Sequence, residues 1–310
     1  MRAIVRLCLV PFFLVPVAAP AASPALETHE CVRNGGKIAE ERFVPIGGIE
    51  QWMTIRGASC ANPVVLFVHG GPGNPLTPYA AKVYGAWEKD FTLVQWDQRG
   101  AGRTFGRNKG SADETLTVER MAKDGIEVAE YLTHRLGKRK VILKGGSWGS
   151  VLAVHMAKMR PDLFTAYVGT SQLVSYRDNS LASYTQVLAR ARAAGDSKTV
   201  AAIEALGPPP WKNPRNFGIL RRATRVYEGK VSDPAPQAWW TRAPEYATAQ
   251  AGAEYEAGED YAYLQFVGME GNGMLSTIDL RKLGTRFDIP VYLIQGAEDL
   301  VTTKEVTKAW

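Results

Sequence analysis

The sequence predicts an α/β fold, in which a mostly parallel central sheet is flanked by helices and carries an inserted helical cap. Three observations lead to this prediction. Short apolar runs alternate with helical stretches over residues 42–171, and a further apolar run lies at 290–296. The run at 64–68 is continuously apolar, which is typical of a strand covered on both faces. Between residues 175 and 278 the strand pattern stops, so we expect that segment to form the cap.

The N-terminal segment, residues 1–25, has the pattern of a secretory signal peptide. Arg2 and Arg6 precede an almost wholly apolar run at 4–17, and small residues follow, with a candidate cleavage site at 19–21. The alternative is an uncleaved membrane anchor. Because the run is shorter than the ~20 residues that a span needs and contains two prolines, we expect cleavage and export, either to the periplasm or by secretion.

The first part of the core, residues 26–174, is expected to alternate strands and helices. The helix over 118–136 is predicted from apolar residues near helical spacing. The elements expected in order are a hairpin (42–46 and 50–55), a strand (64–68), a helix (79–89), a strand (91–96), a helix (118–136), a strand (141–143) leading into a helix, and a strand (166–168).

The cap, residues 175–278, is rich in Ala, Arg, Glu and Tyr and is interrupted by a proline-rich break at 207–211. We expect it to be helical. The second part of the core, residues 279–310, contains the apolar run at 290–296, which predicts another buried strand.

A motif of chemical interest, GGSWG, occupies residues 145–149 directly after a predicted strand and before a predicted helix. G-x-S-x-G at a strand-to-helix turn is the nucleophile elbow of α/β-hydrolases, and the motif alone would be weak evidence. The glycines allow the strained turn that lifts the serine hydroxyl clear of the sheet. The sequence therefore predicts that Ser147 is a nucleophile.

A glycine-rich turn, HGGPG at residues 69–73, follows the predicted strand at 64–68. Such a turn offers backbone N–H groups to the oxygen that becomes negative during acyl transfer. We expect the Gly71 amide to act together with the Trp148 amide as the oxyanion hole. The alternative is a simple tight turn.

Two further segments carry carboxylates at the ends of predicted strands. Asp97 and Arg99 are expected to form buried charge-assisted hydrogen bonds under the site. Asp97 is not expected to be the triad acid, because the acid follows the nucleophile in chain order in this architecture. Asp299, in preference to Glu298, is expected to orient a catalytic histidine.

The motifs at 69–73, 97–104 and 145–150, in this order, resemble the prolyl iminopeptidase family of α/β-hydrolases over about residues 42–171 and the strand before Asp299. The resemblance implies a serine hydrolase that needs neither cofactor nor metal ion. It would release an N-terminal residue, often proline, from short peptides or arylamides. It also implies Ser147 as nucleophile, Asp299 as acid, and Gly71 with Trp148 as oxyanion hole.

The resemblance further implies a cap carboxylate that binds the substrate's free amine. Glu270 and Glu245 are the candidates, and the alternative is that each is a solvated surface carboxylate. The cap also offers Glu254, Glu256, Glu259 and Asp260. Three tryptophans of the cap, together with several of its tyrosines, are expected to form an apolar pocket suited to a proline ring: Trp211, Trp239 and Trp240.

The catalytic histidine has no candidate in the sequence. His29 and His134 lie in an N-terminal arm and near a helix end, and His69 belongs to the glycine-rich turn, where we expect its backbone to matter more than its ring. His155 lies about 12 Å along the elbow helix from Ser147. We therefore expect the chain to be a C-terminally incomplete hydrolase whose histidine follows Trp310. The alternative is a pseudo-enzyme.

The cysteines and the charge add two expectations. Cys8 would leave with the signal, so Cys31 and Cys60 are expected to form one disulfide in an oxidising compartment, with two unpaired thiols as the alternative. The net charge of +6 is small for a chain of this length. Lys and Arg are concentrated only at residues 135–140, which we interpret as a solvated helix end. We do not expect a nucleic-acid partner, and the oligomeric state stays open.

Together these features predict an exported serine aminopeptidase with an acyl-enzyme mechanism. Two alternatives remain: a carboxylesterase of the same fold, and a non-catalytic binding protein that kept the pocket and lost the base.

Overall fold

The computed structural model describes residues 36–109 and 115–310, and the strands within them form one sheet in the order β1-β2-β4-β3-β5-β6-β7. The β1–β2 and β2–β4 pairs are antiparallel, and every other neighbouring pair is parallel, as predicted. The strands are β1 (Ile38–Ile46), β2 (Ile49–Gly57), β3 (Val64–Val68), β4 (Thr92–Trp96), β5 (Val141–Gly146), β6 (Phe164–Thr170) and β7 (Val291–Ile294).

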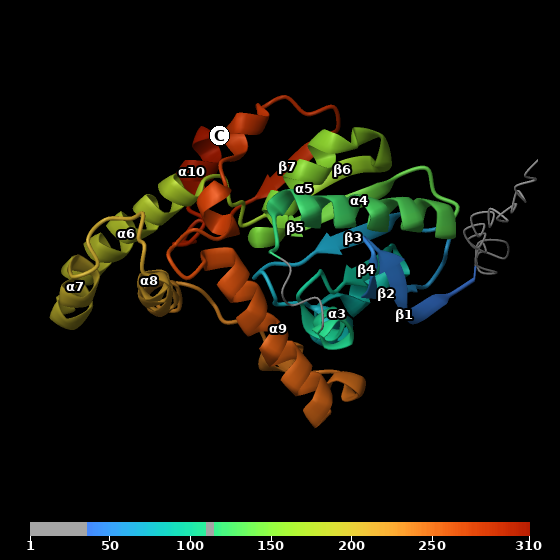
Figure 1. Cartoon of the computed structure of the whole chain (residues 1–310), viewed down its shortest axis with the longest axis horizontal. Helices are drawn as coiled ribbons and strands as arrows, with labels where there is room; N and C mark the ends of the chain where they lie inside the picture. The colour runs from blue at the N-terminus through green and yellow to red at the C-terminus, as the bar shows by residue number, and fades with distance from the viewer. Residues whose placement is uncertain (1–35, 110–114) are drawn as a thin grey trace, which may run out of the picture.

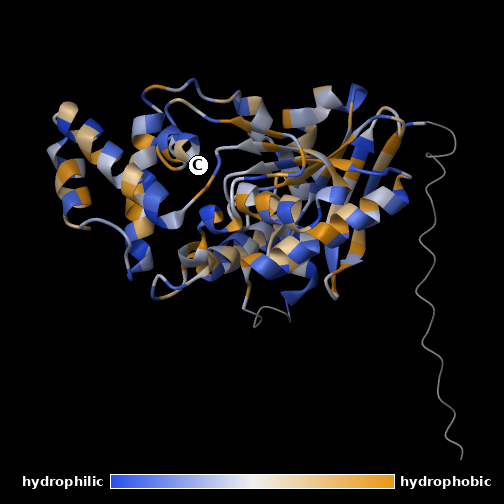
Figure 2. Cartoon of the chain, turned by 90° about the horizontal axis from the view of Figure 1, so that it is seen from above, coloured by the Kyte–Doolittle hydropathy of each residue, from blue (hydrophilic) through white to orange (hydrophobic). Residues whose placement is uncertain are grey.

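Helices flank this sheet and extend from it on one side (Figure 1). Figure 2 shows hydrophobic residues gathered in the strands, with polar residues along the outer sides of the helices. The α-helices are α2 (Ala80–Tyr84), α3 (Gly102–Arg107), α4 (Val118–Arg135), α5 (Trp148–Met159), α6 (Tyr176–Ala193), α7 (Ser197–Glu204), α8 (Pro214–Glu228), α9 (Ala249–Val267) and α10 (Lys304–Ala309). None of the helices in the described ranges is long and apolar enough to cross a membrane.

The core follows the sequence pattern closely at its centre. Every residue of β3 is buried, as a continuous apolar run between helical layers requires. The helix predicted over 79–89 is instead the short α2 between two 3-10 turns. Pro78 lies in the first of these turns, and Gly85 begins the second, so no long helix forms.

The sequence predicts a buried strand at 290–296. The strand is present, but the prediction that it is buried is wrong. β7 pairs only with β6 at the end of the sheet, and Tyr292 and Ile294 are 59% and 62% exposed. An apolar run predicts a strand but not its place in the sheet, and within the described ranges nothing covers the outer side of this edge strand.

The chain between β6 and β7 forms α6 to α9, and its two ends meet at the sheet. The Tyr176 N–H donates to the Ile278 carbonyl oxygen at 3.0 Å, and the Leu280 N–H donates to the Val174 carbonyl oxygen at 2.8 Å. The helices α6, α7 and α8 share a small hydrophobic core of their own, whereas Phe266 of α9 belongs to the main core. The chain leaves the sheet at Thr170, where β6 ends, and re-enters it at Val291, where β7 begins; the predicted cap boundaries at 175 and 278 lie between these points, beside this backbone contact.

Candidate active site

Ser147 lies at the sharp turn between β5 and α5. Its backbone has φ 51° and ψ −121°, a conformation that costs a non-glycine residue on the order of 1–3 kcal/mol. The turn is fixed by the Ser147 N–H, which donates to the Thr170 carbonyl oxygen at 3.0 Å. Strain held in this way at a strand-to-helix turn is the geometry that exposes a nucleophilic hydroxyl.

The glycines on either side of Ser147 are required by close backbone approaches. A Cβ on Gly149 would lie 2.0 Å from the Val68 carbonyl oxygen, and one on Gly145 would lie 2.6 Å from the Gly149 carbonyl oxygen. Both distances are far inside van der Waals contact. These positions admit no side chain without moving the elbow against β3.

The two predicted oxyanion donors lie beside Ser147. Gly71 and Trp148 line one cavity together with Ser147, and the Trp148 amide begins α5, where helix N–H groups lack intrahelical partners. Gly71 has φ 109°, which favours glycine. A Cβ on Gly70 would lie 3.5 Å from the Ser147 Cβ, so this loop passes directly over the nucleophile.

The His69 ring helps to hold this loop in place, whereas the sequence led us to expect that its backbone would matter more than its ring. Its Nδ1 lies 2.8 Å from the Gly70 carbonyl oxygen, and its Nε2 accepts from the Gln98 N–H at 3.2 Å. The Gln98 side chain in turn donates to the His69 carbonyl oxygen and accepts from the Trp148 indole. Burial lowers the pKa of His69 to about 4, so the neutral ring has both nitrogens engaged.

Asp97 and Arg99 are buried and form charge-assisted hydrogen bonds, as expected. The two residues bond to separate partners. Asp97 accepts from the Thr77 hydroxyl and from the Arg103 N–H. Burial raises the pKa of Asp97 to about 6. Arg99 pairs with the fully buried Asp124 at 2.8 Å. Both groups support the loops beneath the site rather than facing the nucleophile.

The two carboxylates considered for the triad acid have different partners. Asp299 lines a cavity of about 700 Å³ together with Ser147. Its oxygens accept from the Val301 N–H, from the Thr302 N–H and hydroxyl, and from the Gln295 amide at 2.6–3.2 Å, which fixes the carboxylate. Glu298 lines the same cavity and forms an ion pair with Arg190 at 2.6 Å. The choice of Asp299 as the acid stays a prediction.

Among the described residues, no histidine serves as the base. His69, His134 and His155 line neither of the two cavities that Ser147 lines, and none has a hydrogen bond to Ser147 or Asp299. His29 lies outside the described residues. The identity of the base therefore stays a prediction.

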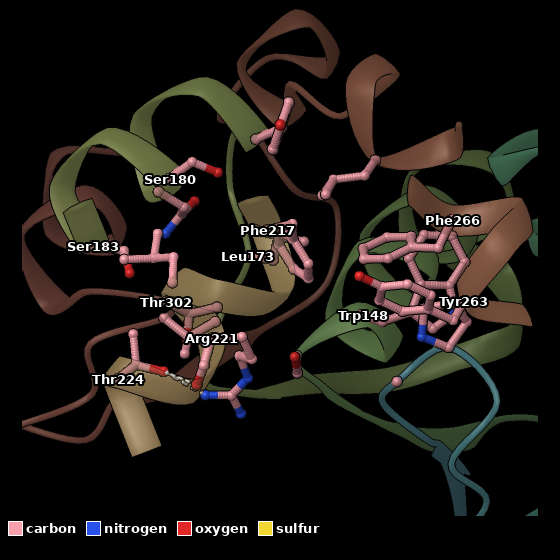
Figure 3. A pocket seen from close by; sticks show the side chains of 18 of the residues that line it. Trp148, Leu173, Ser180, Ser183, Phe217, Arg221, Thr224, Tyr263, Phe266 and Thr302 are labelled. Carbon is pink, nitrogen blue, oxygen red and sulfur yellow. Dashed lines mark hydrogen bonds between the residues drawn. The ribbon is translucent and has the colours of Figure 1, made fainter. Parts of the chain in front are cut away.

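The cavity over Ser147 has a volume of about 460 Å³ and two unlike walls (Figure 3). Aromatic rings of Trp148, Tyr263 and Phe266 lie on one side, and polar side chains of α6 and α8 lie on the other. Glu259 of α9 also lines this cavity.

The two amine-binding candidates lie elsewhere. Glu270 lines a separate surface recess beside Lys212, and Glu245 contacts Arg103 through its backbone oxygen. Among the cap glutamates, Glu259 lines the cavity, and its side chain is exposed. Its spacing of four and seven residues from Tyr263 and Phe266, on one face of a helix, is the sequence signal that could have singled it out.

The predicted apolar pocket does not contain the three cap tryptophans, although two cap tyrosines, Tyr176 and Tyr263, line the cavity. The Trp211 ring is buried in the small core of the cap, and its Nε1–H donates to the Leu206 and Gly207 carbonyl oxygens. Trp239 and Trp240 are exposed. Figure 3 shows that rings from α5 and α9 form the aromatic wall instead.

Cys60 is disulfide-bonded. Its predicted partner, Cys31, lies outside the described residues, so the pairing stays a prediction.

Comparison with known proteins agrees with this geometry. A family model for the alpha/beta hydrolase fold matches residues 63–310. The probable aminopeptidase YbaC of Bacillus subtilis is 30% identical over 88% of this chain and 85% of its own length. The proline iminopeptidase of Lactobacillus delbrueckii is 24% identical over 44% of each chain.

Solved structures share the fold. The proline iminopeptidase of Mycobacterium smegmatis has a TM-score of 0.60 at 22% identity, over 84% of this chain and 83% of its own. The proline iminopeptidase-related protein of Thermus thermophilus has a TM-score of 0.54 at 20% identity, over 87% and 85% of the two chains. The chain therefore belongs to the α/β-hydrolase fold family, among relatives that are named aminopeptidases and proline iminopeptidases.

Proposed function

We propose that this protein is a serine hydrolase that releases an N-terminal proline, or a similar small residue, from short peptides. The observation that carries the proposal is Ser147 at a strained elbow, facing a cavity that two backbone N–H groups and one carboxylate also line. The names of the relatives support aminopeptidase chemistry in particular.

In the proposed reaction, the Ser147 oxygen attacks the carbonyl carbon of the first residue, and the hydroxyl proton passes to a base. The N–H groups of Gly71 and Trp148 stabilise the oxyanion. The peptide C–N bond then breaks as the leaving amine takes up that proton, which leaves an acyl-enzyme that water hydrolyses. The base is a histidine held by Asp299, and the cavity shared by Ser147 and Asp299 is its proposed place.

Glu259 is the proposed partner of the substrate's protonated amine. A charged amine in a partly desolvated cavity needs an opposite charge or several acceptors. Glu259 supplies that charge, and the rings of Tyr263 and Phe266, next along the same helix, offer an apolar surface for a proline side chain. This assignment replaces Glu270 and Glu245.

The proposal is tested with the purified protein, a fluorophosphonate probe and prolyl p-nitroanilide. We expect labelling at Ser147 that Ser147→Ala abolishes, and hydrolysis of the free-amine substrate but not of its N-acetylated form. Glu259→Gln should lower kcat/KM on the free amine by about two- to fivefold, because the substrate's cation loses its charged partner; the Glu259 side chain is exposed, so the pair would be solvated. Glu256→Gln, one turn earlier on α9 and outside the cavity, is the matched control.

The possible outcomes separate the alternatives. Labelling that survives Ser147→Ala would remove Ser147 as the nucleophile. Activity confined to p-nitrophenyl esters would favour a carboxylesterase. Neither labelling nor turnover by the purified protein would favour a binding protein.

We also propose that the protein is exported to the periplasm or secreted, from the charged and apolar pattern of its first 25 residues. The mature N-terminus should then fall between Ala19 and Glu27, and mass analysis without reductant should find Cys31 joined to Cys60. N-terminal sequencing that finds Met1 retained would contradict export. Free thiols at the two cysteines would contradict the disulfide.

A further inference from the structure

The wall of the Ser147 cavity opposite the aromatic rings carries two arginines. Arg221 and Arg225 lie four residues apart on α8, and both line the cavity, as does Thr224. Figure 3 shows the Arg221 side chain extending from α8 toward the middle of the cavity, across from Tyr263 and Phe266. Glu259 lies on α9, on the other side. The cavity therefore has an acidic group on one wall and two basic groups on the other.

The Arg221 guanidinium is held on α8 by Thr224 and by a long ion pair with Glu228. Its Nη1–H donates to the Thr224 hydroxyl oxygen at 2.9 Å, and the same hydroxyl donates to the Arg221 carbonyl oxygen at 2.8 Å. The Glu228 carboxylate forms an ion pair with the same Nη1 at 3.7 Å, and the structure gives no other carboxylate within 4.0 Å of Arg221 in the described ranges. A guanidinium has five N–H donors, so most of those on Arg221 remain for another acceptor.

The electrostatic surroundings of α8 favour an added anion. Burial lowers the pKa of Arg221; Arg225 lowers it further, while Glu228 and Asp299 oppose the shift. Within residues 36–109 and 115–310, no carboxylate lies within 4.0 Å of the Arg225 guanidinium, whereas Arg190 and Arg192 of α6 are both paired. Two like charges on one helix face repel each other, and a bound carboxylate would relieve this.

We propose that Arg221 and Arg225 bind the C-terminal carboxylate of the substrate, so that the preferred substrates are dipeptides and other very short peptides with both termini free. This inference rests on the proposed function and deepens it. Glu259 would hold the amine of the first residue, Ser147 would attack its carbonyl carbon, and the arginines would hold the carboxylate on the leaving side. A cavity of about 460 Å³ with opposite charges on facing walls suits such a zwitterion.

The test measures binding apart from turnover. In the Ser147→Ala protein, calorimetry compares the dipeptide Pro-Ala with its C-terminal amide, Pro-Ala-NH2. We expect the free acid to bind about tenfold more tightly at low salt, with a smaller difference at high salt. Arg221→Gln and Arg225→Gln should each reduce the difference to about twofold or less. Arg215→Gln, on the same helix but outside the cavity, should preserve it.

The outcomes distinguish this inference from the proposed function. Equal affinities for the acid and the amide, with normal hydrolysis of prolyl p-nitroanilide by the unmodified enzyme, would overturn the carboxylate site and leave the peptidase standing. A preference for the free acid without any hydrolysis would support the carboxylate site and contradict the peptidase. If neither dipeptide binds, the inference is overturned.

Discussion

At the scale of single residues, burial shifts the pKa values of two groups near the elbow in opposite directions. The pKa of His69 is lowered to about 4, so its ring stays neutral and keeps both of its hydrogen bonds at neutral pH. The pKa of Asp97 is raised to about 6, so its buried carboxyl group is charged at neutral pH at a cost to stability. Neither group needs to meet the substrate for its protonation to affect the site.

Asp97→Asn tests the cost of that charge. Between pH 4 and 6 the unfolded chain has already lost the proton that the folded chain retains, so stability falls as pH rises through this window. The unfolding free energy of the wild type, relative to Asp97→Asn, should therefore decrease by a few kcal/mol from about pH 4 to pH 7. Denaturant unfolding of both proteins across this range measures it. Parallel pH curves would show that Asp97 carries no such penalty.

At the scale of elements, the packing of α5 against β3 fixes the elbow. A Cβ at position 149 would overlap the Val68 carbonyl oxygen at the end of β3, and neither backbone segment can yield without moving Ser147 or the Gly71 loop. The site therefore depends on the approach of one helix to one strand as much as on the nucleophile itself.

Gly149→Ala should accordingly lower the unfolding free energy by about 2–4 kcal/mol and reduce labelling of Ser147, because overpacking shifts the elbow. Gly85→Ala is the matched control. Its Cβ would meet nothing within 4 Å, and its backbone is helical, so the substitution should be neutral or slightly stabilising. Thermal and urea unfolding report the stabilities. Equal stability of the two variants would contradict the close approach.

At the scale of the whole molecule, one cluster links the hairpin, α3 and the cap. The Arg103 guanidinium lies over the rings of Trp52 and Tyr246, at 4.5 and 4.2 Å, and donates to the Glu245 carbonyl oxygen at 2.8 Å. The Trp52 indole donates to the Tyr246 hydroxyl at 2.9 Å. These contacts tie the segment before α9, and hence the wall that carries Glu259, to the core.

Arg103→Ala should therefore loosen the cap more than it destabilises the core. Loss of the ring and carbonyl contacts is expected to cost about 1–3 kcal/mol. Limited trypsin digestion should then cut faster at Lys230 or Arg242, which flank an exposed stretch. Arg107→Ala is the control, since Arg107 pairs with Glu50 and contacts no cap residue that carries the site. Equal cleavage rates for the two variants would show that the Arg103 contacts do not hold the cap against the core.

Local sequence patterns determined the centre of the fold and the elbow. The apolar run at 64–68 became β3 without change, and GGSWG became a strained turn at Ser147, because both depend on contacts within or next to the segment. The choice of Asp299 over Glu298 stays a prediction, since both residues line the cavity that Ser147 also lines.

Only the tertiary structure decided the features that depend on which distant segments meet. The exposure of β7 follows from its position at the edge of the sheet, which its own residues do not encode. Glu259, rather than Glu270 or Glu245, lines the cavity because α9 presents that helix face to Ser147, and Arg221 faces it from α8. A residue's type and the periodicity around it are given by the local sequence. Its distance from Ser147 depends instead on how the cap packs on the sheet.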